Sequence, residues 1–189
     1  MKKLLCFIDD SPEERALFAE VFGAPDAAFE AICAETFDEA LRRLRDLGRT
    51  PDLFVLDLYF PGGEIEETGE EEISEPAFLP DQGDMTRAFL NLETARRRFQ
   101  TLRRALGQTP AGGLELLRRA GEAFPGVPAV TYTRKGTIEE ARRARRAGAR
   151  DVLQKPSGRD WDDTRRLTRV RRGELEAAFE EAMAAGSKG

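Results

Sequence analysis

The stretch PDLFVLDLYFPGG, residues 51–63, decides how this chain is expected to fold. Leu53–Leu56 is a short continuous apolar run, which is typical of a strand buried on both faces of a parallel sheet. Asp57 ends the run, and a turn at Pro61-Gly62-Gly63 follows. Asp57 is therefore either the first acid of an acidic surface or a chemical site at the end of a buried strand.

The same pattern recurs along the chain and predicts four more strands, each separated by an amphipathic helix. Ser11, for example, is a good N-cap for the first helix, and Glu14 is placed to complete a capping box. The last helix is expected from Trp161 to about Ala185. Strands alternating with helices imply right-handed crossovers and a parallel sheet covered on both faces. The other predicted strands are Leu4–Ile8, Phe29–Ala34, Val127–Tyr132 and Asp151–Gln154.

Such sheets bind ligands at the carboxyl ends of their strands, where polar residues stand in this sequence. These residues are Asp9, Asp10, Asp57, Thr133 and Lys155. Three converging carboxylates favour a hard cation such as Mg²⁺, and a lysine and a hydroxyl can share the charge of a phosphoryl group. Each residue alone has an ordinary interpretation, for example charges near a helix N-terminus or a surface lysine. Their coincidence at one edge favours a phosphoryl site, with Asp57 as acceptor.

A long segment interrupts the regular pattern after the third strand. Residues 62–110 separate Pro61 from the expected helix at Gly113–Phe124, far more than such a connection usually needs. Its first part, 64–75, is strongly acidic, contains no lysine or arginine, and is expected to be a loop. Its second part, about 84–106, is expected to be a helix that begins at Asp84 and stops at Gly107. The apolar stripe of this helix must be buried on this domain, on another copy or on a partner. The stripe comprises Met85, Phe89, Leu92, Phe99, Leu102 and Leu106.

Composition excludes several classes of function. The 189 residues fit a single domain, 1–189, with the insertion at 62–110, and the net charge of −5 argues against a nucleic-acid partner. No run approaches the roughly 18 apolar residues of a membrane span, and no signal peptide is recognisable, so we expect no membrane partner and a cytoplasmic location. The chain has no histidine, so it cannot itself carry a phosphohistidine.

The segments FIDDSPEER, PDLFVLDLYFPGG, GGLELLRRA, VPAVTYTRKG and GARDVLQKP resemble the receiver domain of bacterial two-component response regulators. The resemblance covers about residues 2–63 and 111–185, and no output domain follows, so a stand-alone receiver is expected. It implies a doubly wound five-stranded sheet in the order 2-1-3-4-5. It also implies that Asp57 is the phosphoacceptor and that Asp9, Asp10, Asp57 and the backbone carbonyl of Tyr59 bind Mg²⁺. Thr133 matches the switch hydroxyl and Lys155 the phosphate-binding lysine.

Three positions depart from the family pattern. Arg134 stands where a small residue is usual, and it either narrows phosphate access or adds positive charge at the mouth of the site. Val152 replaces the aromatic partner of the switch hydroxyl, for which Tyr132 is a nearby substitute. Tyr59 is large for a residue that flanks the attacking water, which favours slow loss of the phosphoryl group.

These observations leave three hypotheses. The first is a phosphorelay receiver, a signalling domain rather than an enzyme. It takes its phosphoryl group from a histidine kinase or phosphotransfer protein, signals to an unknown output protein, and at most phosphorylates itself from small donors and dephosphorylates itself. The second is a phosphorylation-independent adaptor that acts through the inserted helix, which is also a candidate homodimer contact. The third, a phosphohydrolase of the haloacid-dehalogenase type, is disfavoured because Asp9 and Asp10 are adjacent rather than in an Asp-x-Asp arrangement.

Overall fold

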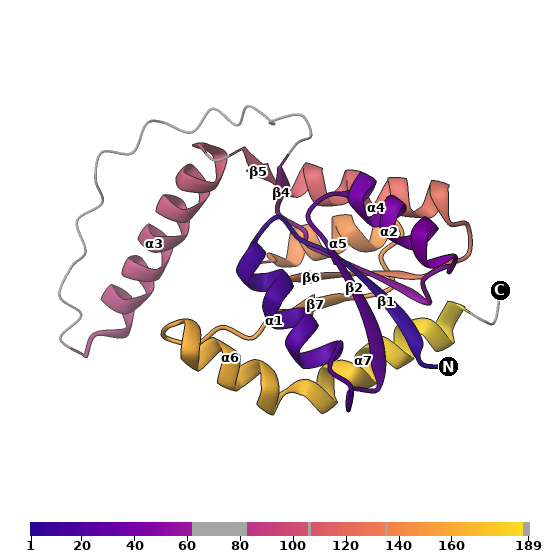
Figure 1. The fold of residues 1–189 in the computed structure, drawn as a ribbon. Coiled ribbons are helices and arrows are strands. Elements are labelled where there is room, and N and C mark those ends of the chain that lie inside the picture. The colour runs from indigo at the N-terminus through magenta and orange to yellow at the C-terminus, as the bar shows by residue number, and fades with distance from the viewer. Residues whose placement is uncertain (62–82, 106, 135, 187–189) are drawn as a thin grey trace.

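The central sheet consists of five parallel strands, which the computed structural model places in the order β2-β1-β3-β6-β7 (Figure 1). The structure describes residues 1–61, 83–105, 107–134 and 136–186. The strands are β1 (Lys3–Ile8), β2 (Phe29–Ala34), β3 (Leu53–Leu56), β6 (Ala129–Thr133) and β7 (Val152–Gln154). Because β6 and β7 are the fourth and fifth strands of this sheet, the predicted doubly wound fold and its order 2-1-3-4-5 are confirmed.

Helices cover both faces of the sheet, because successive side chains of a strand point to opposite sides. Leu4, Cys6 and Ile8 pack against one set of helices, and Leu5 and Phe7 pack against the other. The first set is α2 (Phe37–Leu47), α4 (Pro110–Ala123) and α5 (Ile138–Arg146). The second set is α1 (Pro12–Phe22) and α7 (Arg172–Gly186), with α6 (Trp161–Val170) leading into α7.

The side chains of Ser11, Thr36 and Thr137 cap the helices that they precede. At α5, Thr137 and Glu140 form a complete capping box. At α1, Ser11 accepts a hydrogen bond from the Glu14 backbone N–H, as expected. The capping box predicted there is wrong, because the Glu14 carboxylate instead forms an ion pair with Arg134. The Ser11 cap is thus kept, while a long-range ion pair takes the Glu14 side chain that would have completed the capping box.

The single helix expected from Trp161 to about Ala185 is divided into α6 and α7 at Arg171. One turn before the break, the Thr168 hydroxyl donates to the Thr164 carbonyl, a contact that often bends helices. Val170, at the end of α6, is 71% exposed. The bend leaves Leu175 and Phe179 buried against the sheet.

The segment after β3 leaves and re-enters the domain through a short antiparallel pair of strands. In this pair, β4 (Phe60–Pro61) lies against β5 (Gln108–Thr109), so that Pro61 is opposite Gln108. We call this pair the neck. Between the two strands lies α3 (Met85–Ala105), where the sequence predicts a helix at about 84–106. Gly107 follows with a φ of +67°, which suits a glycine after a helix. The acidic loop expected at 64–75 lies outside the described residues.

Helix α3 stands beside the layered body of the domain rather than within it (Figure 1). Among its predicted stripe residues, Phe99 is half-buried, and its ring meets the Tyr59 ring edge-on at 6.4 Å. Leu106 lies outside the described residues. Most of the stripe is therefore not buried on its own domain. The exposed fractions are 82% for Met85, 58% for Phe89, 50% for Leu92 and 55% for Leu102.

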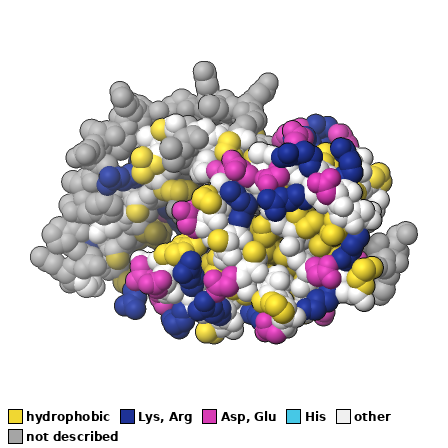
Figure 2. Space-filling view, in the orientation of Figure 1, with side chains coloured by type: hydrophobic (Ala, Val, Ile, Leu, Met, Phe, Trp, Pro, Cys, Tyr) yellow, Lys and Arg dark blue, Asp and Glu magenta, His cyan; other side chains and the backbone are white. Residues whose placement is uncertain are grey.

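Charged side chains of both signs are mixed over the face that carries α2 and α4 (Figure 2). Arg119 of α4, for example, pairs with Asp38 of α2 at 2.5 Å, and Arg118 pairs with Glu115 at 2.6 Å. No helix in the described parts of the chain is long and apolar enough to cross a membrane.

Candidate functional site

Backbone hydrogen bonds that continue beyond the strand ends place the predicted site residues at one edge of the sheet. The Asp9 N–H donates to the Ala34 carbonyl at 3.1 Å, and the Asp57 N–H donates to the Ile8 carbonyl at 3.0 Å. The Lys155 N–H donates to the Thr133 carbonyl at 2.8 Å. Each residue is thus fixed by the strand next to its own, and residues far apart in sequence converge.

Three carboxylates meet at this edge. One oxygen from each of Asp9, Asp10 and Asp57 lies within 4.8 Å of the others. Asp9 and Asp57 are buried and Asp10 is half-buried. Burial raises the pKa of Asp57 to about 7, with Lys155 opposing the rise and Asp9 and Asp10 adding to it. The site is therefore electrostatically costly unless cations share its charge.

Lys155 supplies one such cation from within the core. Its ammonium group donates to Asp9 Oδ2 and, at 3.0 Å, to Asp57 Oδ1. It also lies 5.7 Å from the ring centres of both Phe7 and Tyr132. Burial alone would favour the neutral amine, but Asp57 and Asp9 outweigh it and raise the pKa of Lys155 above its usual value. Lys155 is thus held as a cation between two acids.

Thr133 brings a hydroxyl that still lacks a partner. The side chain is buried, and its Oγ1 atom makes no hydrogen bond within the described part of the protein. A buried hydroxyl without a partner is unusual, because such groups normally find one. Together with three oxygen ligands that suit a hard cation, this orphaned donor fits an anionic group such as phosphoryl bound with a divalent ion.

Arg134 is directed toward α1 and the loop after β7. Its Nε atom donates to Glu14 Oε1 at 2.7 Å, and a second nitrogen contacts the same oxygen. Its third nitrogen donates to the Pro156 carbonyl at 2.9 Å and to Ser157 Oγ at 3.0 Å. The guanidinium also lies 5.5 Å from the Trp161 ring centre. The charge of Arg134 is therefore paired with the carboxylate of Glu14.

The other two positions that depart from the family pattern, Tyr59 and Val152, are packed against the domain, and so is the nearby Tyr132. The Tyr59 hydroxyl donates to Glu140 Oε2 at 2.6 Å, which connects the segment after Asp57 to the start of α5. Tyr132 is buried in the aromatic cluster around Phe179, with ring centres 6.4 Å apart. Val152 is half-buried and packs against the core on the α2, α4 and α5 side. The roles predicted for these residues, including the Tyr59 carbonyl as a metal ligand, stay predictions.

One contact at the acidic site was missed by sequence reasoning. Gln108 of β5 donates from its amide nitrogen to Asp10 Oδ2 at 2.8 Å. The two residues are 98 positions apart, and Gln108 lies at the end of the segment that interrupts the fold pattern. No local motif marks a glutamine as a partner of a distant carboxylate, so the sequence carried no signal for it.

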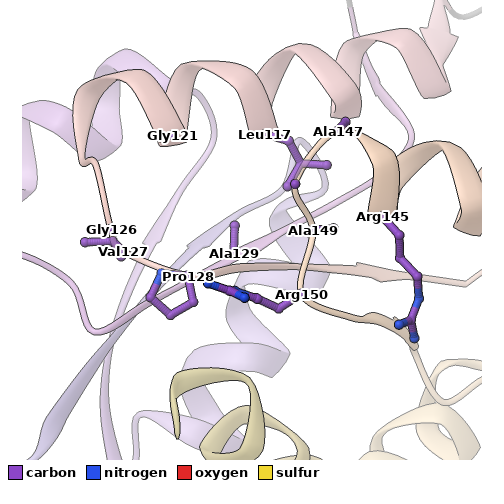
Figure 3. A pocket seen from close by; sticks show the side chains of 11 residues that line it. Leu117, Gly121, Gly126, Val127, Pro128, Ala129, Arg145, Ala147, Ala149 and Arg150 are labelled. Atoms are coloured by element: carbon purple, nitrogen blue, oxygen red, sulfur yellow. The ribbon is translucent and has the colours of Figure 1, made fainter. Parts of the chain in front are cut away.

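A cavity of about 500 Å³ lies at the opposite end of the sheet, where β6 begins (Figure 3). Val127, Pro128 and Ala129 line it together with Arg145 and Arg150. Arg145 also forms an ion pair with Asp151. This cavity is separate from the acidic site and contains none of the predicted site residues.

No family model matches the sequence, and no curated protein matches it either. Solved structures do match the fold. NtrX from Brucella abortus is 21% identical with a TM-score of 0.58, and the match covers 99% of this chain and 28% of NtrX. A CheY-like response regulator receiver domain protein from Methanospirillum hungatei is 16% identical with a TM-score of 0.56. The match covers 100% of this chain and 98% of that protein. The Mn²⁺-bound response regulator Rcp1 is 14% identical with a TM-score of 0.52. The match covers 92% of this chain and 94% of Rcp1. These likenesses show a receiver-type fold.

Proposed function

We propose that this protein is a response regulator receiver that accepts a phosphoryl group on Asp57. The observation that carries the proposal is the buried ammonium of Lys155, which bridges Asp9 and Asp57 beside the unpartnered hydroxyl of Thr133. An ordinary surface lysine would be exposed, and an ordinary core would not bury two acids beside a third that is half-buried. The receiver-type fold places this cluster where such sheets bind ligands.

The chemistry is a transfer between two nucleophiles. A carboxylate oxygen of Asp57 forms a bond to phosphorus while the bond from phosphorus to the donor nitrogen or oxygen breaks. The leaving group keeps the electron pair and takes up a proton. Lys155 already holds Asp57 Oδ1, whereas no hydrogen bond from the described residues reaches Oδ2, which leaves that oxygen available for attack. Lys155 and Thr133 then donate to the phosphoryl oxygens.

A divalent cation belongs in this scheme because of the acids that surround Asp57. Asp9, Asp10 and Asp57 would hold Mg²⁺, with the backbone carbonyl of Tyr59 as a further ligand. When bound, the ion neutralises the negative charge that gathers around the phosphoryl oxygens. The Mn²⁺-bound form of Rcp1, a response regulator of similar fold, supports this assignment.

The donor is another protein or a small molecule, because the chain contains no histidine. A histidine kinase or a phosphotransfer protein fits, since phosphohistidine transfers its group readily to a carboxylate. Phosphorylation would shift the domain between two conformational populations, and the shift would be read by an output protein.

The direct test is incubation with acetyl phosphate and Mg²⁺, followed by intact-protein mass spectrometry. We expect the wild type to gain the mass of one phosphoryl group and Asp57→Asn to gain none. EDTA should suppress the gain. Asp52→Asn serves as a control, because Asp52 precedes β3 whereas Asp57 follows it, so Asp52 lies at the end of the strand that is far from the acidic site. Equal mass gains in wild type and Asp57→Asn, or none in either, would contradict the proposal.

A second candidate function rests on the exposed apolar side chains of α3. A helix with Met85 82% and Phe89 58% exposed is a plausible contact for another protein. In that case the domain is an adaptor whose signalling does not depend on phosphorylation. A partner whose affinity falls with Phe89→Ser but is unchanged by Asp57→Asn would favour the adaptor over the phosphoacceptor.

A further inference from the structure

The neck that carries α3 touches the acidic site directly. Gln108 is the first residue of β5 and lies opposite Pro61 of β4. Its side-chain amide donates to Asp10 Oδ2 at 2.8 Å. Of the three clustered acids, Asp9 and Asp57 are bound by Lys155, whereas Asp10 is bound by Gln108. Each acid of the cluster is therefore held by a donor from another part of the chain.

We propose that Gln108 is a positioning residue for the divalent cation, and that it links occupancy of the metal site to the neck of α3. This inference rests on the proposed function, because it requires that the acids bind a metal ion. It goes beyond that function by assigning a role to a residue of the inserted segment.

The physical argument begins with the freedom of Asp10. It is the only half-buried acid of the three, whereas Asp9 and Asp57 are buried. A half-buried aspartate can rotate toward solvent, and a metal site loses affinity when a ligand must first be brought into place. A hydrogen bond to one carboxylate oxygen fixes the direction of the other, which is how partners behind a ligand generally raise affinity. The Gln108 amide occupies Oδ2 and leaves Oδ1 for the ion.

The choice of an amide rather than a charged donor also matters. A lysine or arginine at position 108 would neutralise Asp10 and compete with the ion. The amide is neutral, so it orients the carboxylate while leaving its negative charge in place. Lys155 already provides the one buried ammonium of the described site.

The linkage to α3 follows from the short distance along the chain. Helix α3 ends at Ala105, and Gln108 is three residues later. On the other side, Thr109 is the N-cap of α4 and accepts a hydrogen bond from the Gly112 N–H at 3.3 Å. If the ion holds Asp10 in place, Asp10 in turn holds Gln108, and the neck opens less often. By reciprocity, a stable neck favours metal binding to the same extent.

The test measures metal affinity and neck stability in the full chain. Free Mn²⁺ is followed by electron paramagnetic resonance during titration of wild type, Gln108→Leu and Gln154→Leu. Gln154 is a matched control, because it is an exposed strand residue and makes no described side-chain hydrogen bond. We expect Gln108→Leu to weaken Mn²⁺ binding about tenfold, and the control to differ little from wild type. In Asp10→Asn, which already lacks the ligand, adding Gln108→Leu should cause little further loss.

Hydrogen exchange supplies a readout that needs no variant. In the wild type, Mg²⁺ should slow exchange of the backbone N–H groups at residues 107–109 and 111–112 relative to EDTA. As an added check, Gln108→Leu should lose this protection. If Gln108 had a merely structural role, Gln108→Leu would lower the unfolding stability in EDTA, but Mg²⁺ would still slow hydrogen exchange in the neck of the variant.

The outcomes separate this inference from the proposed function. Equal Mn²⁺ affinity in wild type and Gln108→Leu overturns the inference while leaving the phosphoacceptor proposal intact. Unchanged exchange at residues 107–112 on addition of Mg²⁺ to the wild type also overturns it. A wild type that binds no Mn²⁺ and gains no phosphoryl mass overturns both.

Discussion

The guanidinium of Arg134 contacts the carboxylate of Glu14 through two nitrogen atoms, although 120 residues separate the two in sequence. The pair joins the end of β6 to the first turn of α1. Arg134 also donates to Pro156 and Ser157, so it holds the loop after β7 as well. Three segments that surround the acidic site are thereby tied to one side chain.

Arg134→Ala should destabilise the protein by about 2–3 kcal/mol, because it leaves Glu14 largely buried without its partner. Urea unfolding of the variant measures this loss. Arg142→Ala, an exposed position on α5, is the control and should change stability by no more than about 0.5 kcal/mol. In the Glu14→Gln background, Arg134→Ala should cost less stability than it does in wild type. An equal loss of stability in both backgrounds would show that the ion pair does not cause the loss.

Lys155→Met should cost about 3 kcal/mol in EDTA, which corresponds to a fall in melting temperature of about 10 °C. The substitution keeps an unbranched side chain, one atom shorter, but leaves Asp9 and Asp57 facing each other without a cation. Mg²⁺ should then stabilise the variant by a larger increment than it stabilises wild type, because it replaces part of the lost charge. Thermal unfolding with and without Mg²⁺ tests both statements.

Lys3→Met is the matched control for this experiment, since Lys3 is exposed on β1. If Lys155→Met had the same melting temperature as wild type in EDTA, the contacts of Lys155 with Asp9 and Asp57 would contribute nothing to stability. If Mg²⁺ raised the melting temperatures of wild type and Lys155→Met by the same amount, the ion would not bind near Lys155.

The parallel strands could be predicted from the sequence because buried parallel strands are continuous apolar runs, and because N-caps such as Thr137 act within one turn. The order of the strands was implied only by the resemblance to receiver domains. The convergence of Asp9, Asp57 and Lys155 was predicted because each follows the carboxyl end of a parallel strand. The contacts of Gln108 and Glu14 could not be predicted, since each depends on a side chain about a hundred residues away. At Glu14, a local rule even gave the wrong partner, because a nearly buried ion pair outweighs an exposed cap. The exposure of the α3 stripe was also unpredictable, as periodicity shows a face but not what covers it.

The two cysteines should be unreactive in the native protein at pH 8. Burial raises the pKa of the Cys6 and Cys33 thiols to about 12. Because their pKa is near 9 in the unfolded chain, the unfolded state loses these protons first as the pH rises. Unfolding stability should therefore fall between about pH 9 and pH 12. Iodoacetamide with mass detection should label neither thiol rapidly in native protein and both in guanidinium. Cys6 is buried and Cys33 is half-buried, so rapid native labelling of Cys6 would contradict its burial, and rapid labelling of Cys33 would contradict its raised pKa.

The approach of α4 to the segment after Asp57 gives the sharpest test of the structure. Gly113 lies in the first turns of α4 and is buried. A methyl group placed on it would lie 2.2 Å from the Leu58 carbonyl oxygen and 2.6 Å from the Leu58 Cα. These are backbone atoms one residue from Asp57, so they cannot move aside as a flexible side chain would.

Gly113→Ala should therefore lower unfolding stability by about 3 kcal/mol or more, and it should weaken Mn²⁺ binding because the Asp57 segment has to shift. Gly121→Ala on the same helix is the matched control, since a methyl group there would meet nothing within 4 Å. It should leave metal binding unchanged and, because alanine favours helix over glycine, raise stability by up to about 1 kcal/mol. Urea unfolding and Mn²⁺ titration measure both effects. If the two variants behaved alike, α4 would have to pack farther from Leu58 than the structure places it, and the acidic site would not be braced by that helix.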